Sequence, residues 1–230
     1  MLPLAELVAT LRRLYGPPAA PPVTRPLELI LFENAAYLVD DARRLAVWQR
    51  LRARVGTTPQ KILAAPDPVL ADAIVDGGMH PLARAAKLKR IAEIALEAFG
   101  DDLDEVLERP LPEAKRALRK FPGIGEPGAE KVLLFAGARK ILALDSNGLR
   151  VLVRLGFGTE QKNYAATYRS AQGAVGDLSA RPFPWLVAAH QLLRRHGQEL
   201  CKASAPRCER CPLAPSCRYA TAGSAAARAK

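Results

Sequence analysis

Residues 115–135, KRALRKFPGIGEPGAEKVLLF, contain the stretch that decides the fold. Two glycines, Gly123 and Gly125, bracket Ile124, and segments with helical patterns flank this turn on both sides. Glycine fits such a turn because positive φ angles and close backbone approach are unfavourable for other residues. Pro127 falls in the first turn of the second helix, where a missing N–H does no harm. The stretch predicts a helix–hairpin–helix unit.

The hairpin and the overall charge both favour a phosphate-bearing partner. Backbone N–H groups at the start of a helix can hold a phosphate oxygen, which makes Gly123, Ile124 and Gly125 candidate DNA contacts. Lys and Arg number 34 against 23 Asp and Glu, a formal net charge of +11, and this favours nucleic acid over membrane. Taken alone, G-x-G fits a plain turn between helices, and the charge alone fits a merely basic soluble protein.

The rest of the 230-residue chain also predicts helices. Residues 80–100 form an amphipathic pattern that ends at Gly100, and further helices are expected near 146–155, 163–177 and 183–196. No five-residue stretch alternates cleanly enough for a strand, so the expected fold class is all-α. No run of 18 apolar residues predicts a membrane span, and the start lacks the features of a secretory signal.

All four cysteines lie close together near the C-terminus, with the spacing C-x6-C-x2-C-x5-C. A disulfide framework would spread its cysteines along the chain, whereas a cluster in a chain of this size indicates a metal site. Thiolates select zinc or iron–sulfur centres. Zinc ribbons usually have two C-x2-C pairs and this chain has one, so the spacing favours an iron–sulfur cubane. The ligands are Cys201, Cys208, Cys211 and Cys217.

Asp145 follows an apolar run and precedes an amphipathic helix that contains Arg150 and Arg154. An aspartate in this position can be an N-cap that accepts hydrogen bonds from backbone N–H groups. It can also stabilise a cationic sugar transition state or orient a water molecule. The sequence leaves both roles open.

In this order, FPGIGEP, LDSNGLRV, His196–Gly197 and the four-cysteine spacing resemble the endonuclease III family of helix–hairpin–helix DNA glycosylases. The resemblance implies a two-lobed fold, with a six-helix barrel over residues 29–139 (hairpin 121–127) and an iron–sulfur domain over 1–28 and 140–220. A disordered basic tail is expected at 221–230. The resemblance also implies that Asp145 is the catalytic carboxylate, that the cysteines hold a [4Fe-4S] cluster, and that a flipped base enters between the lobes.

The chain departs from the family where bifunctional members carry a lysine that attacks the sugar. Pro127 stands at that position, and proline cannot form a Schiff base. Lys131, four residues later on the same helix face, is a tentative displaced nucleophile; a phosphate contact or a surface lysine is the alternative. LDSNGLRV also resembles the adenine-mismatch members, which lack the lysine but carry a further domain for which 230 residues leave no room.

An ungapped fit of PLELILFENAAYLVDD onto the family's base-pocket helix suggests four pocket residues. Leu38 replaces a glutamine that fills the gap left by the extruded base, and its apolar side chain can only act as a wedge. Glu33 falls on the catalytic glutamate of the adenine-mismatch type, or else has a solvated role. Asn34 and Tyr37 complete the set. We also expect a basic DNA-facing surface, with these candidates: Arg84, Lys87, Lys89, Arg90 and Arg150.

The expected function is a base-excision DNA N-glycosylase that binds duplex DNA containing a damaged base or an abasic site. Lyase activity is expected to be absent, or weak through Lys131. The alternative is a catalytically silent binder of abasic or distorted DNA. We expect a monomer in the cytoplasm, associated with the nucleoid.

Overall fold

The computed structural model describes residues 2–222, and these residues form helices and no strand. This confirms the all-α prediction. Of the tail expected at 221–230, residues 223–230 lie outside the described residues. No described helix is long and apolar enough to cross a membrane.

The chain divides into two compact units. Residues 21–139 form the first, here called the hairpin unit, and residues 1–20 with 140–230 form the second, here called the cysteine unit. The second unit therefore contains both ends of the chain. Each unit is described by itself below.

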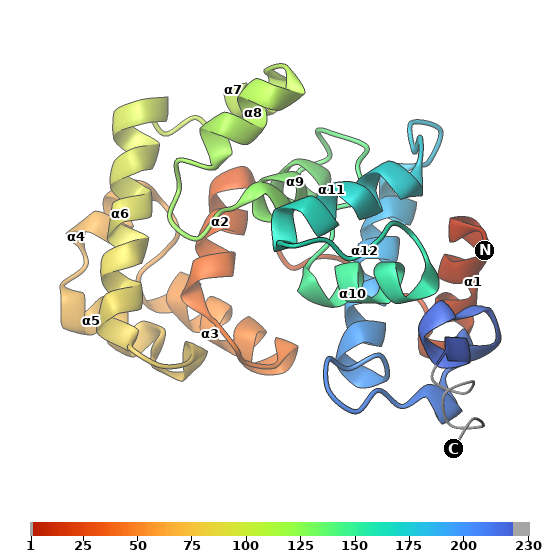
Figure 1. The fold of residues 1–230 in the computed structure, drawn as a ribbon. Helices are drawn as coiled ribbons and strands as arrows, with labels where there is room; N and C mark the ends of the chain where they lie inside the picture. The colour runs from red at the N-terminus through yellow and green to blue at the C-terminus, as the bar shows by residue number, and fades with distance from the viewer. Residues whose placement is uncertain (1, 223–230) are drawn as a thin grey trace. The chain divides into compact units, whose positions relative to one another are not determined.

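The hairpin unit packs around its longest helix, α6 (Pro81–Phe99), which contacts α2, α4 and α5 (Figure 1). Leu88, Ile91 and Ala92 of α6 are fully buried. Prolines begin most of these helices because a first-turn proline loses no hydrogen bond. The remaining helices are α2 (Pro26–Ala35), α3 (Asp41–Arg54), α4 (Pro59–Ala64), α5 (Asp67–Ala73), η1 (Val75–Gly77), α7 (Asp104–Glu108), α8 (Leu111–Leu118) and α9 (Glu126–Phe135).

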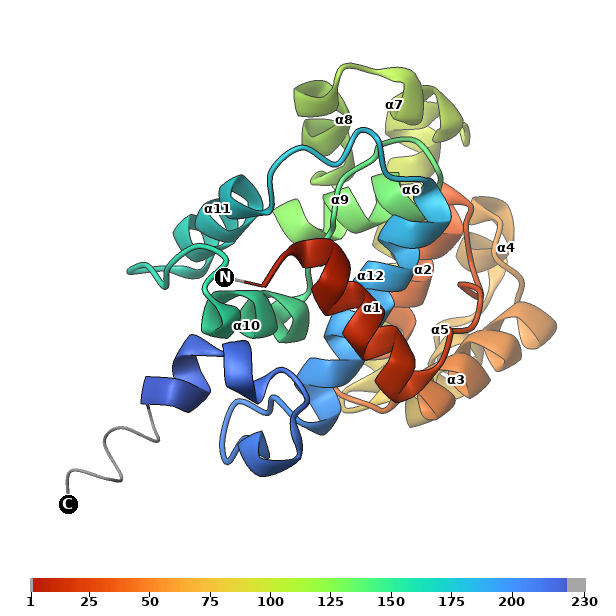
Figure 2. The same cartoon turned by 90° about the vertical axis from the view of Figure 1, so that its right-hand side faces the viewer.

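The cysteine unit packs around α12 (Phe183–Glu199), which contacts α10 (Ser146–Leu155) and α1 (Leu4–Tyr15) (Figure 2). Buried leucines of these three helices meet in one apolar core. Gly197 allows a close approach to α10, since a Cβ there would lie 2.7 Å from the Asn147 carbonyl oxygen. The other elements are α11 (Tyr164–Val175), η2 (Cys208–Arg210) and η3 (Ala214–Ser216).

Candidate functional site

The hairpin lies between α8 and α9, and its first glycine is a steric requirement. Gly123 has φ +75°, and a Cβ there would lie 2.6 Å from Oδ1 of Asn34. Asn34 is buried, and its Nδ2 donates to the Ile30 carbonyl oxygen at 2.9 Å. This predicted pocket residue therefore packs against the hairpin backbone within the hairpin unit.

The backbone of the hairpin, and not the Ile124 side chain, is what could hold a phosphate. The Ile124 side chain is buried, and its N–H donates to the Phe121 carbonyl oxygen at 3.2 Å. Gly125 is the N-cap of α9, and Pro127 lies in its first turn as predicted. The first amides of a helix have no intrahelical acceptor, so the amides at the start of α9 are the better phosphate donors.

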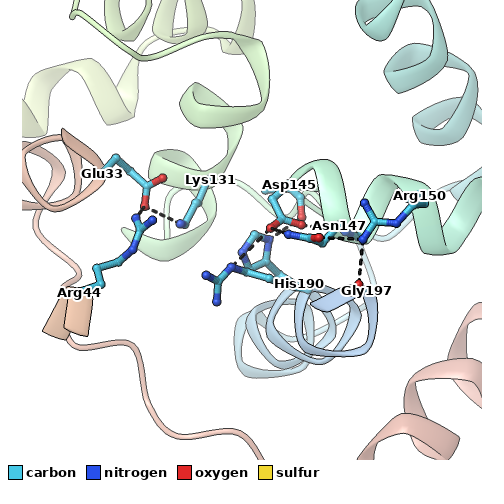
Figure 3. Close-up of polar contacts among 11 residues, drawn as sticks. Glu33, Arg44, Lys131, Asp145, Asn147, Arg150, His190 and Gly197 are labelled. Carbon is cyan, nitrogen blue, oxygen red and sulfur yellow. Dashed lines mark hydrogen bonds and ion pairs between the residues drawn. The ribbon is translucent and has the colours of Figure 1, made fainter. Parts of the chain in front are cut away.

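Lys131 is held in an ion pair. Its Nζ lies 2.6 Å from Oε1 of Glu33 and 5.6 Å from the centre of the Phe135 ring. The same Glu33 oxygen lies 3.6 Å from Nη1 of Arg44 (Figure 3). Glu33 thus lies between two cations, and the Lys131 ammonium is stabilised by a carboxylate.

Two of the proposed pocket residues, Tyr37 and Leu38, are exposed in the loop between α2 and α3. Tyr37 and Leu38 are 67% and 78% exposed, and Leu38 has φ +56°, a strained angle for leucine. The Tyr37 N–H donates to the Gly77 carbonyl oxygen at 2.7 Å, which ties this loop to the segment that carries exposed Met79. An exposed leucine held in a strained conformation fits the predicted wedge.

Arg84 corrects one expectation. We predicted it on the basic surface, but it is only 6% exposed and donates to four backbone carbonyl oxygens. Burial lowers the pKa of this guanidinium. Arg84 therefore holds two segments together. It binds the Ala35 carbonyl at the end of α2 and the carbonyls of Val75, Gly78 and Met79. Lys87 and Arg90 are exposed, whereas Lys89 is half-buried and paired with Asp67. A role for these residues in DNA binding stays a prediction.

Asp145 is the N-cap of α10. Its Oδ1 accepts from the Gly148 N–H at 2.7 Å, while Oδ2 accepts from Nδ2 of Asn147 at 3.2 Å (Figure 3). Nε of Arg194 lies 3.4 Å from the same Oδ2, and the Asp145 side chain is 27% exposed. The N-cap role is thus real. Each carboxylate oxygen has two acceptor sites, so these contacts leave Asp145 with acceptor capacity for a sugar or a water molecule.

The segment around Asp145 is fixed by neighbouring side chains. Nδ1 of buried His190 lies 2.7 Å from the Ala143 carbonyl oxygen, directly before Asp145. Arg150, a predicted DNA contact, donates to Oδ1 of Asn147 and to the Gly197 carbonyl oxygen, both at 2.8 Å (Figure 3). Its Nε also donates to the Cys201 carbonyl oxygen. Partial burial lowers the pKa of Arg150, and a role in phosphate binding stays a prediction.

All four cysteines are unpaired thiols and line one pocket of about 360 Å³, a volume that includes space open to solvent. Basic groups approach the sulfurs: Nη1 of Arg154 lies 3.4 Å from Sγ of Cys201, and Nε2 of His196 lies 3.4 Å from Sγ of Cys211. Burial and the neighbouring thiols raise the pKa of Cys208 and Cys211. Among residues 2–222, no three His, Cys, Asp or Glu side chains converge on a single-ion site.

Several polar partners at these sites were missed by the sequence reasoning, above all Arg44, His190 and Arg194. His190 and Arg194 stand four residues apart in α12, which places them on one helix face. Their partners lie in the segment that leads into α10, so only the tertiary fold brings them together. The partner of His196 also comes from a distant part of the chain: its Nδ1 lies 3.0 Å from the hydroxyl of Tyr15. His196 is buried, and burial lowers its pKa to about 4.

Comparisons with known proteins test the family and the fold. Endonuclease III of Treponema pallidum is 30% identical over 163 residues, which cover 71% of this chain and 70% of that protein. Endonuclease III of Sulfolobus acidocaldarius is 29% identical over 196 residues, covering 84% and 80%. A solved structure of an endonuclease III–DNA covalent intermediate matches with a TM-score of 0.71 at 22% identity, covering 97% of this chain and 100% of that one. No protein-family model matches the chain.

The identity and coverage define a class, the helix–hairpin–helix DNA N-glycosylases of base-excision repair. Within that class, the chain belongs to the endonuclease III family.

Proposed function

We propose that this endonuclease III relative removes a damaged or mismatched base by hydrolysis and leaves the DNA strand intact. The observation that carries the proposal is a contrast between two side chains. Asp145 keeps acceptor capacity at the start of α10, beside Arg194 at 3.4 Å, whereas Lys131, the nearest lysine in the sequence to the position of the missing nucleophile, is paired with Glu33 at 2.6 Å. Pro127 has no side-chain nucleophile.

The reaction needs only water as co-reactant. The bond between C1′ of the sugar and the base nitrogen breaks, and its electron pair leaves with the base. Positive charge develops on the sugar, and the carboxylate of Asp145 stabilises that charge and orients the water molecule. The water oxygen bonds to C1′, and its proton ends on the departing base. The products are a free base and an abasic sugar.

DNA would be held by the hairpin backbone and by exposed lysines and arginines. The amides at the start of α9 would bind one phosphate, because they have no intrahelical acceptor. Leu38 would fill the space left by an extruded base; its exposure on a loop fixed by Arg84 supports this role. Binding driven by phosphate contacts weakens as salt rises. Association with the nucleoid follows from DNA as the substrate and belongs to the same proposal.

The four cysteines are proposed to hold a [4Fe-4S] cluster. The residues present fit it: four thiols line one pocket, and the Arg154 guanidinium and the His196 ring approach two of the sulfurs. A cubane needs one thiolate for each iron. The cluster would tie the 201–217 loop to α10 and α12, and Cys201, Cys208, Cys211 and Cys217 would be its ligands. Anaerobic purification followed by iron and sulfide determination tests this, with about four of each expected.

The activity itself is tested by a screen of duplexes that carry oxidised, alkylated, deaminated or mismatched bases. The expected result is release of at least one base by the wild-type protein and none by Asp145→Asn. Tight binding of abasic DNA without release of any base would instead favour the silent binder.

A further inference from the structure

The phosphate-binding end of α9 carries an acidic residue. Glu126 is the first residue of α9, directly after the N-cap Gly125. The positive end of a helix attracts negative charge, so the Glu126 carboxylate occupies the region in which a DNA phosphate would bind. Two anions at one helix end repel each other. This feature needs an explanation if the hairpin binds DNA.

A lysine from the first helix of the motif meets this carboxylate. Nζ of Lys115, on α8, lies 2.5 Å from Oε1 of Glu126 and 2.7 Å from Oε1 of Glu130, one turn further along α9. The three side chains are partly buried, with Lys115 20%, Glu126 30% and Glu130 9% exposed. One ammonium therefore bridges the two helices that carry the hairpin.

The charge state of Lys115 suits this position. Partial burial lowers its pKa, but hydrogen bonds to Glu126 and Glu130 outweigh that effect, and its pKa is raised overall. Lys115 is therefore an ammonium at neutral pH. Its Nζ contacts the carboxylates and is thereby directed at α9.

We infer that Lys115 is a positioning residue that makes the hairpin competent to bind a DNA phosphate, by neutralising Glu126 and drawing its carboxylate toward α8. The inference rests on the proposed function, in which the hairpin grips DNA. Lys115 acts on the phosphate through Glu126. Without it, the carboxylate at the start of α9 repels the phosphate.

A double-mutant cycle on DNA binding tests this role. The dissociation constant for a duplex with an abasic-site analogue is measured for wild type, Lys115→Met, Glu126→Gln and the double variant. We expect Lys115→Met to weaken binding about tenfold and Glu126→Gln to strengthen it about threefold. The double variant should bind about as tightly as Glu126→Gln alone, because Lys115 has no charge left to neutralise, whereas independent effects would leave it about threefold weaker than wild type.

Lys120→Met is the matched control, since Lys120 is an exposed lysine close to the hairpin in the sequence. Its loss should weaken binding by about threefold or less, and Glu126→Gln should change the affinity of Lys120→Met by the same factor as in wild type. Salt titrations separate the two modes of action. A lysine that touches phosphate lowers the slope of log K against log salt by about one when removed. If Lys115→Met gives that change and Glu126→Gln does not restore binding, the inference is overturned.

The outcome remains decisive if Lys115→Met folds poorly. Glu126→Gln alone must then bind more tightly than wild type, and equal or weaker binding overturns the inference. If wild type itself does not bind the duplex at low salt, the proposed function fails. If wild type binds and the cycle shows no coupling, only the role of Lys115 fails.

Discussion

The region around Asp145 and the region around Lys131 differ in the contacts that they give to a charged side chain. Asp145 sits at a helix start, where a backbone N–H and the Asn147 amide hold it in place, and its side chain remains 27% exposed. Lys131 lies in the second turn of α9, and its ammonium is bonded to Glu33 and sits near an aromatic ring. Both groups lie near an opposite charge, since Nε of Arg194 is 3.4 Å from Asp145, but the ion pair of Lys131 with Glu33 is shorter, at 2.6 Å.

This difference separates two activities that bifunctional glycosylases combine. In the proposed function, the carboxylate of Asp145 supports hydrolysis of the base. Schiff-base chemistry needs an uncharged amine, and an ammonium paired with a carboxylate first has to lose both its proton and its partner. On the proposed function, the chain therefore keeps a group for base removal, and Lys131 is not a free amine ready for strand cleavage.

The largest effect is expected from Asp145→Asn. Asparagine caps helices about as well as aspartate, so the fold should be retained while the negative charge is lost. Base excision should fall by at least about 100-fold, with binding to abasic DNA changed little. Single-turnover base release and a thermal melt measure the two quantities.

Asp177→Asn is the matched control, because Asp177 also accepts a backbone hydrogen bond, from Ser179, in an exposed loop of the same unit. Its excision rate should equal that of wild type. Equal losses in both variants would contradict a chemical role for Asp145.

A glycine pair tests the hairpin. Gly123→Ala places a Cβ 2.6 Å from Asn34 at φ +75°, while Gly137→Ala meets nothing within 4 Å at φ +72°. Both pay the cost of a left-handed alanine, about 1–2 kcal/mol, but only the first adds a clash. We expect Gly123→Ala to lose about 1 kcal/mol more stability and to bind DNA about tenfold more weakly than Gly137→Ala. Urea melts and binding titrations measure both, and indistinguishable variants would contradict the tight fit.

Leu38→Gly should move stability and activity in opposite directions. Glycine relieves the strain at φ +56°, so the free energy of unfolding should rise by about 0.5–1 kcal/mol. Loss of the wedge should slow base excision several-fold. Asp101→Gly, which relieves a similar φ of +70° outside the proposed pocket, should stabilise without slowing excision. A normal excision rate for Leu38→Gly would contradict the wedge role of Leu38.

The smallest effect concerns pH. The pKa of Lys115 is raised above its usual 10.5 in the folded protein, so its ion pairs contribute stability below pH 10.5, and this contribution is lost as pH rises through the raised value. Partial exposure limits it to less than about 1 kcal/mol. The stability difference between wild type and Lys115→Met should therefore shrink above pH 10.5, as denaturant melts at several pH values would show.

The sequence predicted much of this architecture because its signals are local. Pro81 and Gly100 mark the ends of α6, Asp145 and Gly156 bracket α10, and the cysteine spacing singled out one loop. The ion pair between Glu33 and Lys131 joins residues 98 positions apart, which no local pattern encodes. Arg84 looked like a surface residue because arginine rarely lies in a core. Its burial depends on the carbonyls of two loops that only the folded chain brings around it.

The central claim is that this protein releases a base and leaves the strand uncut. On a duplex with a base that the screen shows to be excised, base release and strand nicking are measured in one reaction, with and without alkali, alongside borohydride trapping. We predict base release, nicks only after alkali, and no trapped adduct; Pro127→Lys, which restores an amine at that position, is the positive control for trapping. Nicking without alkali by the wild type, with an adduct lost in Lys131→Ala, would contradict the account.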